Sequence, residues 1–182
     1  MSSATKILPY YTYDEYRQWE GRWEIIDGIP YAMSPAPIPR HQWVSANIMS
    51  ELKQSVKKAL CKNCKVYNSI DVKISEDTVV QPDALIVCKE ITKPFLDFTP
   101  ALVVEILSPA TAMKDRNNKF YQYQFFRIPY YLIVDIDKNA VEIYLLDEDG
   151  KYQLQEFAQD QPYTFLLGEG CSVPVVLKNI WE

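Results

Sequence analysis

The sequence is poor in glycine, has a single histidine and lacks a surplus of positive charge. Its 182 residues include 5 Gly against 12 Pro, which argues against a flexible, linker-rich chain. The formal net charge is −5, so any contact with nucleic acid has to come from a local basic patch. A composition of 48% hydrophobic and 24% charged residues is typical of a globular protein, and the length predicts one domain spanning residues 1–182.

Long hydrophobic segments are also missing. The N-terminal stretch MSSATKILPYYTYDEY has no apolar segment of the kind that secretory signal peptides carry. The longest apolar runs, such as residues 101–104, are far too short to span a bilayer. We therefore expect a soluble, cytoplasmic protein without a membrane partner.

Cysteine is scarce, and its spacing invites a zinc or redox interpretation. Cys61 and Cys64 form a close pair, but a structural zinc site needs four nitrogen or sulfur ligands. Only Cys88, Cys171 and His41 are left to complete such a site, and none of them forms a second close pair. A thioredoxin-like pair would open a helix, whereas this pair follows the end of a predicted one. We therefore expect four ordinary free thiols.

Periodicity and turn signals predict a mixed α/β (α+β) fold. The Asp27-Gly28 dipeptide between two apolar runs indicates a hairpin, and Val44, Ile48 and Leu52 recur at helical spacing. Two continuous apolar runs indicate central strands that are covered on both faces. An extended loop is expected at prolines 35, 37 and 39. The predicted helices cover residues 13–20, 41–60 and 111–126, and the predicted strands cover residues 22–26, 29–33, 65–74, 79–88, 101–107, 130–136, 141–146, 152–157 and 172–176.

Each of the two central strands carries one acidic residue, Asp83 in the first and Glu105 in the second. A lone carboxylate among apolar side chains is costly unless something compensates it. If the strands are antiparallel neighbours, the start of the first lies beside the end of the second, and the two carboxylates converge at one rim. Such a pair favours Mg²⁺ or Mn²⁺, with the carbonyl of Ile106 as a third ligand. Alternatively, each acid pairs with a basic residue or caps a turn.

Four short motifs follow one another in a characteristic order. They are Gln81-Pro82-Asp83, then Val104-Glu105-Ile106-Leu107-Ser108-Pro109 with Thr111, then Asp115, Lys119 and Tyr123, and finally Tyr131-Leu132-Ile133-Val134-Asp135. From about residue 11 to residue 176 the chain thereby resembles the Uma family of putative restriction endonucleases, within the PD-(D/E)XK nuclease superfamily. The resemblance implies a restriction-endonuclease-like fold with a central mixed sheet flanked by helices. It also implies that Asp83 and Glu105 are metal ligands.

The same resemblance adds Glu24 to the site, although the alternative is a solvent-facing position on a half-exposed hairpin. The superfamily places a lysine two residues after its second acid, and here that position is Leu107. We expect Lys119 to replace this lysine by reaching in from the following helix. The alternative for Lys119 is a surface ion pair with Asp115, four residues before it.

Two further residues are candidates for the site. Tyr123 lies one turn beyond Lys119 on the same predicted helix face, where it could orient Lys119 or contact a phosphate. Aromatic core packing is the alternative. His41 is the only side chain whose ordinary pKa suits acid–base chemistry near neutral pH, and it opens the long helix. Packing or capping at the helix N-terminus is its alternative.

Together these features predict an endonuclease that uses Mg²⁺, or Mn²⁺ in its place, to hydrolyse phosphodiester bonds of DNA. The lysines between residues 53 and 65, with Lys114 and Arg116, are candidate contacts to DNA phosphates. The hairpin over residues 144–157 is rich in aromatic residues and suggests a homodimer. The main alternative is a non-catalytic module of the same fold that binds nucleic acid or a protein. A metal-dependent hydrolase of another ester is a lesser one.

Overall fold

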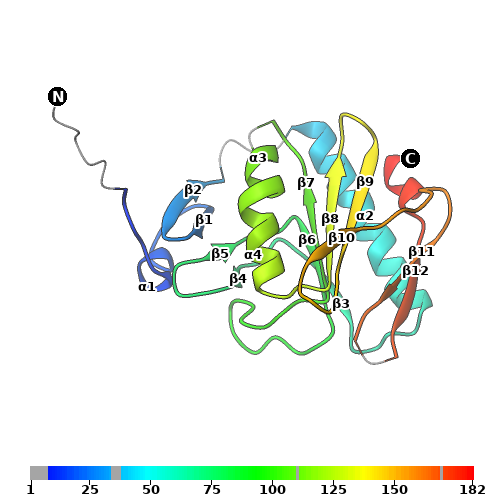
Figure 1. Ribbon diagram of the computed structural model, residues 1–182, viewed down its shortest axis with the longest axis horizontal. Coiled ribbons are helices and arrows are strands. Elements are labelled where there is room, and N and C mark those ends of the chain that lie inside the picture. The colour runs from blue at the N-terminus through cyan, green and yellow to red at the C-terminus, as the bar shows by residue number, and fades with distance from the viewer. Residues whose placement is uncertain (1–7, 34–37, 110, 169) are drawn as a thin grey trace.

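The computed structural model describes residues 8–33, 38–109, 111–168 and 170–182, and the loop expected at Pro35 and Pro37 lies outside them. Figure 1 shows helices on both sides of a central sheet. The helices are α1 (Tyr13–Tyr16), α2 (Pro39–Lys58), α3 (Ala112–Lys114) and α4 (Phe120–Phe125), with a π-helical turn η1 (Asp115–Lys119) between the last two and a 3₁₀ turn η2 (Leu177–Trp181). The strands are β1 (Trp23–Ile26), β2 (Ile29–Ala32), β3 (Lys65–Asn68), β4 (Val72–Lys73), β5 (Val79–Val80), β6 (Ala84–Val87), β7 (Leu102–Ile106), β8 (Tyr130–Asp135), β9 (Ala140–Leu146), β10 (Tyr152–Leu154), β11 (Tyr163–Leu166) and β12 (Ser172–Val175).

The central sheet has six strands in the order β10-β9-β8-β7-β6-β3. β7 and β8 are parallel and are connected through α3, η1 and α4, whereas the other neighbours are antiparallel. The α3–α4 helix covers one face and α2 covers the other (Figure 1). The predicted mixed sheet flanked by helices is therefore confirmed.

Side chains of β7 alternate between two hydrophobic cores. Val104 and Ile106 belong to the core that α2 covers, whereas Val103 packs in the second core with Tyr123 of α4. Because successive side chains of a strand point to opposite faces, Glu105 shares the face of Val103. The alternation therefore directs the Glu105 carboxylate toward the helix that carries Lys119.

A second sheet has the order β2-β1-β5-β4, and its strand β1 carries Glu24. The predicted hairpin is confirmed, since Asp27 and Gly28 both have positive φ angles (52° and 76°), as a type I′ turn requires. The predicted strands 65–74 and 79–88 were wrong as single strands, because each divides between the two sheets. The side chain of Asn68 accepts a hydrogen bond from the Ser69 amide where the first divides, and Pro82 has no amide hydrogen to donate where the second divides.

Other boundaries also differ from the prediction. α1 ends at Tyr16 rather than at residue 20, and β11, which the sequence did not indicate, pairs with β12 in a separate two-stranded sheet. The helix predicted over residues 111–126 is interrupted by η1, a single π-helical turn of the kind that is frequent at functional sites. In the part of the chain that is described, no helix combines the length and apolar character needed to cross a bilayer.

The expectation of four free thiols is wrong. Disulfide bonds join Cys61 to Cys171 and Cys64 to Cys88, over sequence separations of 110 and 24 residues. Folding brings Cys88 and Cys171 next to the close pair, and this convergence depends on tertiary contacts that spacing alone does not reveal.

The aromatic hairpin that suggested a homodimer turns its rings inward. Tyr144 and Tyr152 lie 5.1 Å and 5.2 Å, centroid to centroid, from Phe120 of α4. Tyr152 also donates a hydrogen bond to the carbonyl of Ile128. These two rings therefore stabilise the packing of the helix on the sheet, and the homodimer stays a prediction.

Candidate active site

Asp83 and Glu105 lie side by side at one rim of the central sheet. The antiparallel register pairs Ala84 with Val104, so the residue before the first strand lies next to Glu105. An oxygen of Asp83 (Oδ2) accepts a hydrogen bond of 2.8 Å from the backbone amide of Ile106. The strand pairing that we inferred from the sequence is therefore present, although Asp83 lies just before β6 and not within it.

Lys119 connects the acidic residues of the site. Its Nζ atom lies 2.7 Å from Glu24 Oε1, 2.9 Å from Glu105 Oε1 and 3.7 Å from Asp115 Oδ1. The side chain of Lys119 is 2% exposed, so its pair with Asp115 is not the surface pair of the alternative interpretation. Burial alone would lower the pKa of Lys119, but Glu105 and Glu24 outweigh burial and raise it well above the ordinary value. Lys119 is therefore a buried cation held by carboxylates from two sheets.

Tyr123 adds a hydrogen bond to the same carboxylate. Its hydroxyl group donates to Glu105 Oε1 at 2.5 Å, and its side chain is fully buried. Burial first, and then the charge of Glu105, raise the pKa of Tyr123 well above its usual range, so the hydroxyl remains a donor at neutral pH. Tyr123 thus combines core packing with a polar contact to the site.

Glu24 is completely buried, which rules out the solvent-facing alternative. Its Oε1 accepts a hydrogen bond from the backbone amide of Gln81 at 2.8 Å, and its Oε2 accepts one from Lys114 Nζ at 2.5 Å. Burial tends to raise the pKa of Glu24, but Lys119 and Lys114 outweigh it and lower the pKa. We expected Lys114 to contact DNA phosphates. The sequence does not reveal its ion pair with Glu24, because nothing in the spacing of the two residues relates them.

His41 faces the site from the first turn of α2. Its Nε2 lies 3.1 Å from the Ile106 carbonyl oxygen and 3.4 Å from Asp83 Oδ2. A carbonyl can only accept, so Nε2 carries a proton. Burial lowers the pKa of His41, but the hydrogen bond and charge of Asp83 outweigh burial and raise it. His41 therefore orients both Asp83 and the Ile106 carbonyl, two of the three groups that the sequence suggested as metal ligands.

The site holds more buried acidic groups than basic ones. Among the described residues, Glu24, Glu105 and Asp115 form ion pairs with two lysines, Lys119 and Lys114. Burial is the main cause that raises the pKa of Glu105 well above its ordinary value, and repulsion from the neighbouring acids adds to it. Burial likewise raises the pKa of Asp115. An additional cation would offset this surplus.

The oxygens of the site suit a hard divalent cation. No hydrogen bond from a described residue falls on Asp83 Oδ1 or Glu105 Oε2, because the contacts of both acids use their other oxygen. With the four cysteines held in disulfides, no group of three or more acidic, histidine or cysteine side chains among the described residues is arranged to hold a metal. Two carboxylates with the Ile106 carbonyl nevertheless fit Mg²⁺ or Mn²⁺, since Mg²⁺ usually takes one or two carboxylates and completes its shell with water and substrate oxygens.

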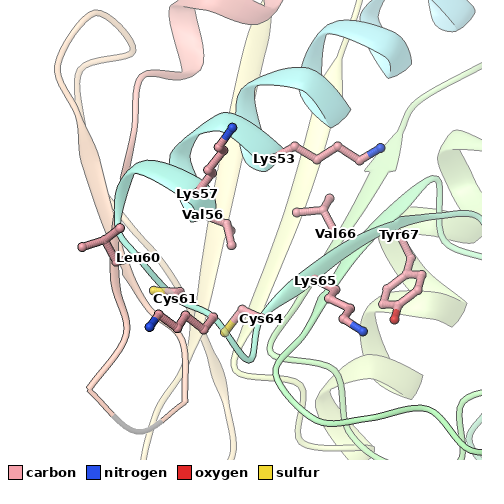
Figure 2. A pocket seen from close by; sticks show the side chains of 10 residues that line it. Lys53, Val56, Lys57, Leu60, Cys61, Cys64, Lys65, Val66 and Tyr67 are labelled. Carbon is pink, nitrogen blue, oxygen red and sulfur yellow. The ribbon is translucent and has the colours of Figure 1, made fainter.

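The predicted DNA contacts lie away from this rim or are already paired. Lys53, Lys57 and Lys65 line a groove near the C-terminal end of α2 (Figure 2). Lys57 is 16 residues beyond His41, or about 24 Å along the helix, too far to contact the same phosphate as His41. Arg116 forms a bidentate ion pair with Glu142.

The Tyr123 hydroxyl gives a first prediction. We expect Tyr123→Phe to lower the free energy of unfolding by about 1–3 kcal/mol, because a buried carboxylate then loses one of its donors. Urea unfolding followed by circular dichroism measures this change. Tyr121→Phe, on the same helix but 66% exposed, is the matched control and should unfold as the wild type does. Equal unfolding midpoints for the wild type and Tyr123→Phe would contradict the prediction.

Comparisons with known proteins agree with this architecture. The model of the Uma2 family, described as putative restriction endonuclease, matches residues 13–175. The uncharacterized protein slr1290 of Synechocystis sp. is 27% identical over 189 residues, which cover 98% of this chain and 97% of that protein. A crystal structure of a putative nuclease belonging to DUF820 from Anabaena variabilis superposes with a TM-score of 0.73 at 16% identity, over 94% of this chain and 97% of that one.

Proposed function

Because the chain belongs to the Uma2 family of putative restriction endonucleases, we propose that it is a Mg²⁺-dependent endonuclease that hydrolyses phosphodiester bonds of DNA. The observation that carries this proposal is the pair of carboxylates at one sheet rim, Asp83 and Glu105, with a buried lysine 2.9 Å from the second. This arrangement gathers the acids and the cation that such chemistry requires.

The divalent ion would be held by Asp83, Glu105 and the carbonyl of Ile106. When bound, Mg²⁺ lowers the pKa of a coordinated water and neutralises charge on the scissile phosphate. Mn²⁺ has the same preference for oxygen ligands and would substitute for it.

The protein's own residues would orient the water and the phosphate. Lys119 lies beside Glu105 and would position the attacking water or stabilise the negative charge that develops on the phosphate. Leu107, at the position where the superfamily has lysine, is 7% exposed and packs in the hydrophobic core, so the cation comes from the helix instead. Glu24 and Tyr123 would fix the positions of Lys119 and Glu105 through their buried hydrogen bonds.

His41 would act as a positioning residue. Its contacts are to Asp83 and the Ile106 carbonyl, so it would hold two of the three metal-binding groups at a fixed separation. Nε2 is occupied in these contacts, and no described residue contacts Nδ1 through a hydrogen bond.

Nicking of supercoiled plasmid DNA tests the proposed function. We expect the purified protein to nick in the presence of Mg²⁺ and not in the presence of a chelator. Asp83→Asn should reduce nicking by at least about 100-fold, which corresponds to about 2.7 kcal/mol of lost transition-state stabilisation. Asparagine keeps an oxygen that can accept the Ile106 amide hydrogen bond, so the strand pairing should survive. Equal nicking by both proteins would point to a contaminating nuclease and contradict the proposal.

A further inference from the structure

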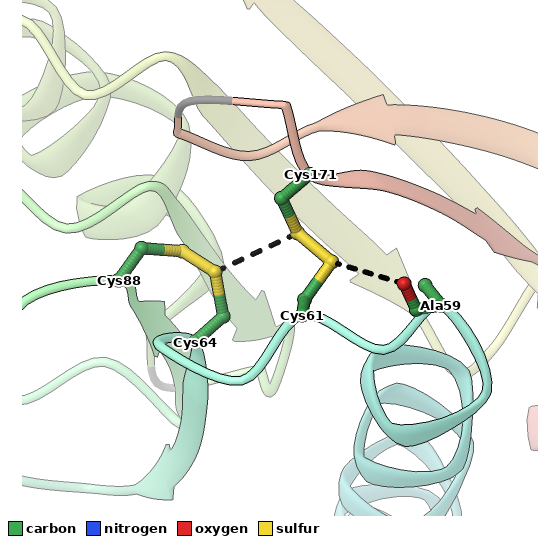
Figure 3. The surroundings of a disulfide bond; sticks show 5 residues. All are labelled: Ala59, Cys61, Cys64, Cys88 and Cys171. Atoms are coloured by element: carbon green, nitrogen blue, oxygen red, sulfur yellow. Dashed lines mark hydrogen bonds between the residues drawn. A yellow bond between two sulfur atoms is a disulfide. The ribbon is translucent and has the colours of Figure 1, made fainter.

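Four sulfur atoms from distant parts of the chain meet at the end of the molecule where α2 finishes. Cys61 and Cys64 follow α2, Cys88 directly follows β6, and Cys171 directly precedes β12 (Figure 3). In the structure they form two disulfides, with Cα–Cα distances of 5.6 Å and 3.8 Å. The disulfides also touch each other, since the sulfur of Cys64 lies 3.6 Å from the sulfur of Cys171.

Strand pairing and backbone hydrogen bonds explain the convergence. The Cys64 amide donates to the Cys61 carbonyl at 3.0 Å, which closes a tight turn between the first two cysteines. The antiparallel register pairs Lys65 with Val87, so Cys64 and Cys88 lie opposite each other just beyond the paired residues. On the third side, the Leu167 amide donates to the Cys171 carbonyl at 2.7 Å and fixes the backbone of Cys171 just before β12.

We propose that, when its cysteines are reduced, this protein binds one zinc ion through Cys61, Cys64, Cys88 and Cys171. Four cysteines are one of the common ligand sets of structural zinc sites, and two of them are typically separated by two to four residues, as Cys61 and Cys64 are. With zinc–sulfur bonds of about 2.3 Å, neighbouring sulfurs of a tetrahedral site lie about 3.8 Å apart. The 3.6 Å separation between Cys64 and Cys171 is already close to this value.

The surroundings suit a tetrathiolate site. Zn²⁺ with four thiolates carries two negative charges, and Lys62 and Lys65 line the same groove as Cys61 and Cys64. Figure 2 shows Lys65 close to Cys64 along the chain. Nearby lysines lower the pKa of a thiol and favour the thiolate that a metal requires. Cys64 and Cys171 are 8% and 9% exposed, so a bound ion would be shielded by the protein while Cys61 and Cys88 remain partly accessible.

The chemistry balances with a thiol reductant. Opening two disulfides requires four electrons and four protons, which two equivalents of a dithiol supply while they close to their own cyclic disulfides. Binding of Zn²⁺ then displaces the thiol protons to solvent, so the affinity for zinc rises with pH. The site would join α2, β6 and the β11–β12 hairpin in a reducing compartment, where disulfides are rare.

The test is a metal titration of the full-length protein in two redox states. Protein reduced with dithiothreitol and desalted without oxygen should bind one Zn²⁺ per chain. Co²⁺ in its place should give the visible absorption of tetrahedral cobalt thiolate. The disulfide form should bind neither ion in this way. One equivalent of Zn²⁺ should raise the Tm of the reduced protein by at least about 5 °C, an increase that a chelator reverses.

Variants test whether these cysteines bind the zinc and whether the zinc site is independent of the proposed metal site at Asp83 and Glu105. Cys88→Ser and Cys171→Ser should each abolish the cobalt thiolate absorption, whereas Asp83→Asn should bind zinc as the wild type does. Lack of stoichiometric zinc binding by the reduced wild type would overturn the proposal, as would unchanged binding in both serine variants. The comparison of reduced and oxidised wild type decides the question even if a serine variant fails to fold.

Discussion

Replacing Lys119 with methionine should lower the free energy of unfolding by about 3–5 kcal/mol, because it leaves buried carboxylates without their cation. Lys119 Nζ contacts Glu24 and Glu105 within 2.9 Å, and all three side chains are almost completely buried. Methionine has a similar length and fills the same space, so the change removes charge and little volume. Natural domains are stable by only about 5–15 kcal/mol, so this loss is a large fraction of the total.

Guanidinium unfolding of Lys119→Met measures this effect. The matched control is Lys138→Met, since Lys138 also forms an ion pair, with Asp135, but its side chain is 74% exposed. That surface change should alter stability by less than about 1 kcal/mol. Adding Glu105→Gln to Lys119→Met should restore part of the lost stability, because one unpaired carboxylate is removed. A wild-type midpoint for Lys119→Met would contradict the buried-cation interpretation.

Replacing Glu105 with glutamine should abolish cleavage while the free energy of unfolding stays close to that of the wild type, in contrast to the loss of stability expected for Lys119→Met. The pKa of Glu105 is raised well above its ordinary value mainly by burial, so its charged form is unfavourable in the folded protein. Glutamine removes that charge, while Lys119 keeps its contact with Glu24. Nicking should nevertheless fall by about 100–1,000-fold, because a neutral amide is a poor ligand for Mg²⁺ and leaves Asp83 as the only charged one.

The Glu105→Gln experiment compares rates of plasmid nicking with midpoints of urea unfolding for the same preparations. Glu142→Gln is the matched control, because Glu142 lies on β9 of the same sheet and pairs with Arg116, away from the rim. It should nick at the wild-type rate. Wild-type nicking by Glu105→Gln would remove Glu105 from the proposed machinery. Loss of activity accompanied by unfolding would assign Glu105 a structural role instead.

The sequence predicts the part of the site that depends on strand pattern. Asp83 and Glu105 are each a single acid in an apolar run. Antiparallel pairing of the two runs is enough to bring the two carboxylates together. The helix face of Asp115, Lys119 and Tyr123 also follows from spacing alone. The π-helical turn at Asp115–Lys119 does not, because no residue in it has a special backbone requirement.

Contacts between separate sheets could not be predicted from the sequence pattern. Glu24 entered only through the family resemblance, since its place in a hairpin is equally compatible with an exposed position. Its second partner, Lys114, lies 90 residues away, and only the folded chain brings the two together. The meeting of Cys88 and Cys171 with the close pair of cysteines is of the same kind, because it depends on the pairing of β3 with β6 and on how the β11–β12 hairpin packs against the central sheet.

Calorimetric titration with Mn²⁺ tests the central claim, that Asp83 and Glu105 hold a divalent cation. The titration uses the disulfide form, in which no thiolate competes for the metal. We predict saturable binding by the wild type and by Glu142→Gln, and its loss in Asp83→Asn and Glu105→Gln. Absence of binding by the folded wild type, or equal binding by all four proteins, would contradict the claim and favour a non-catalytic module of the same fold.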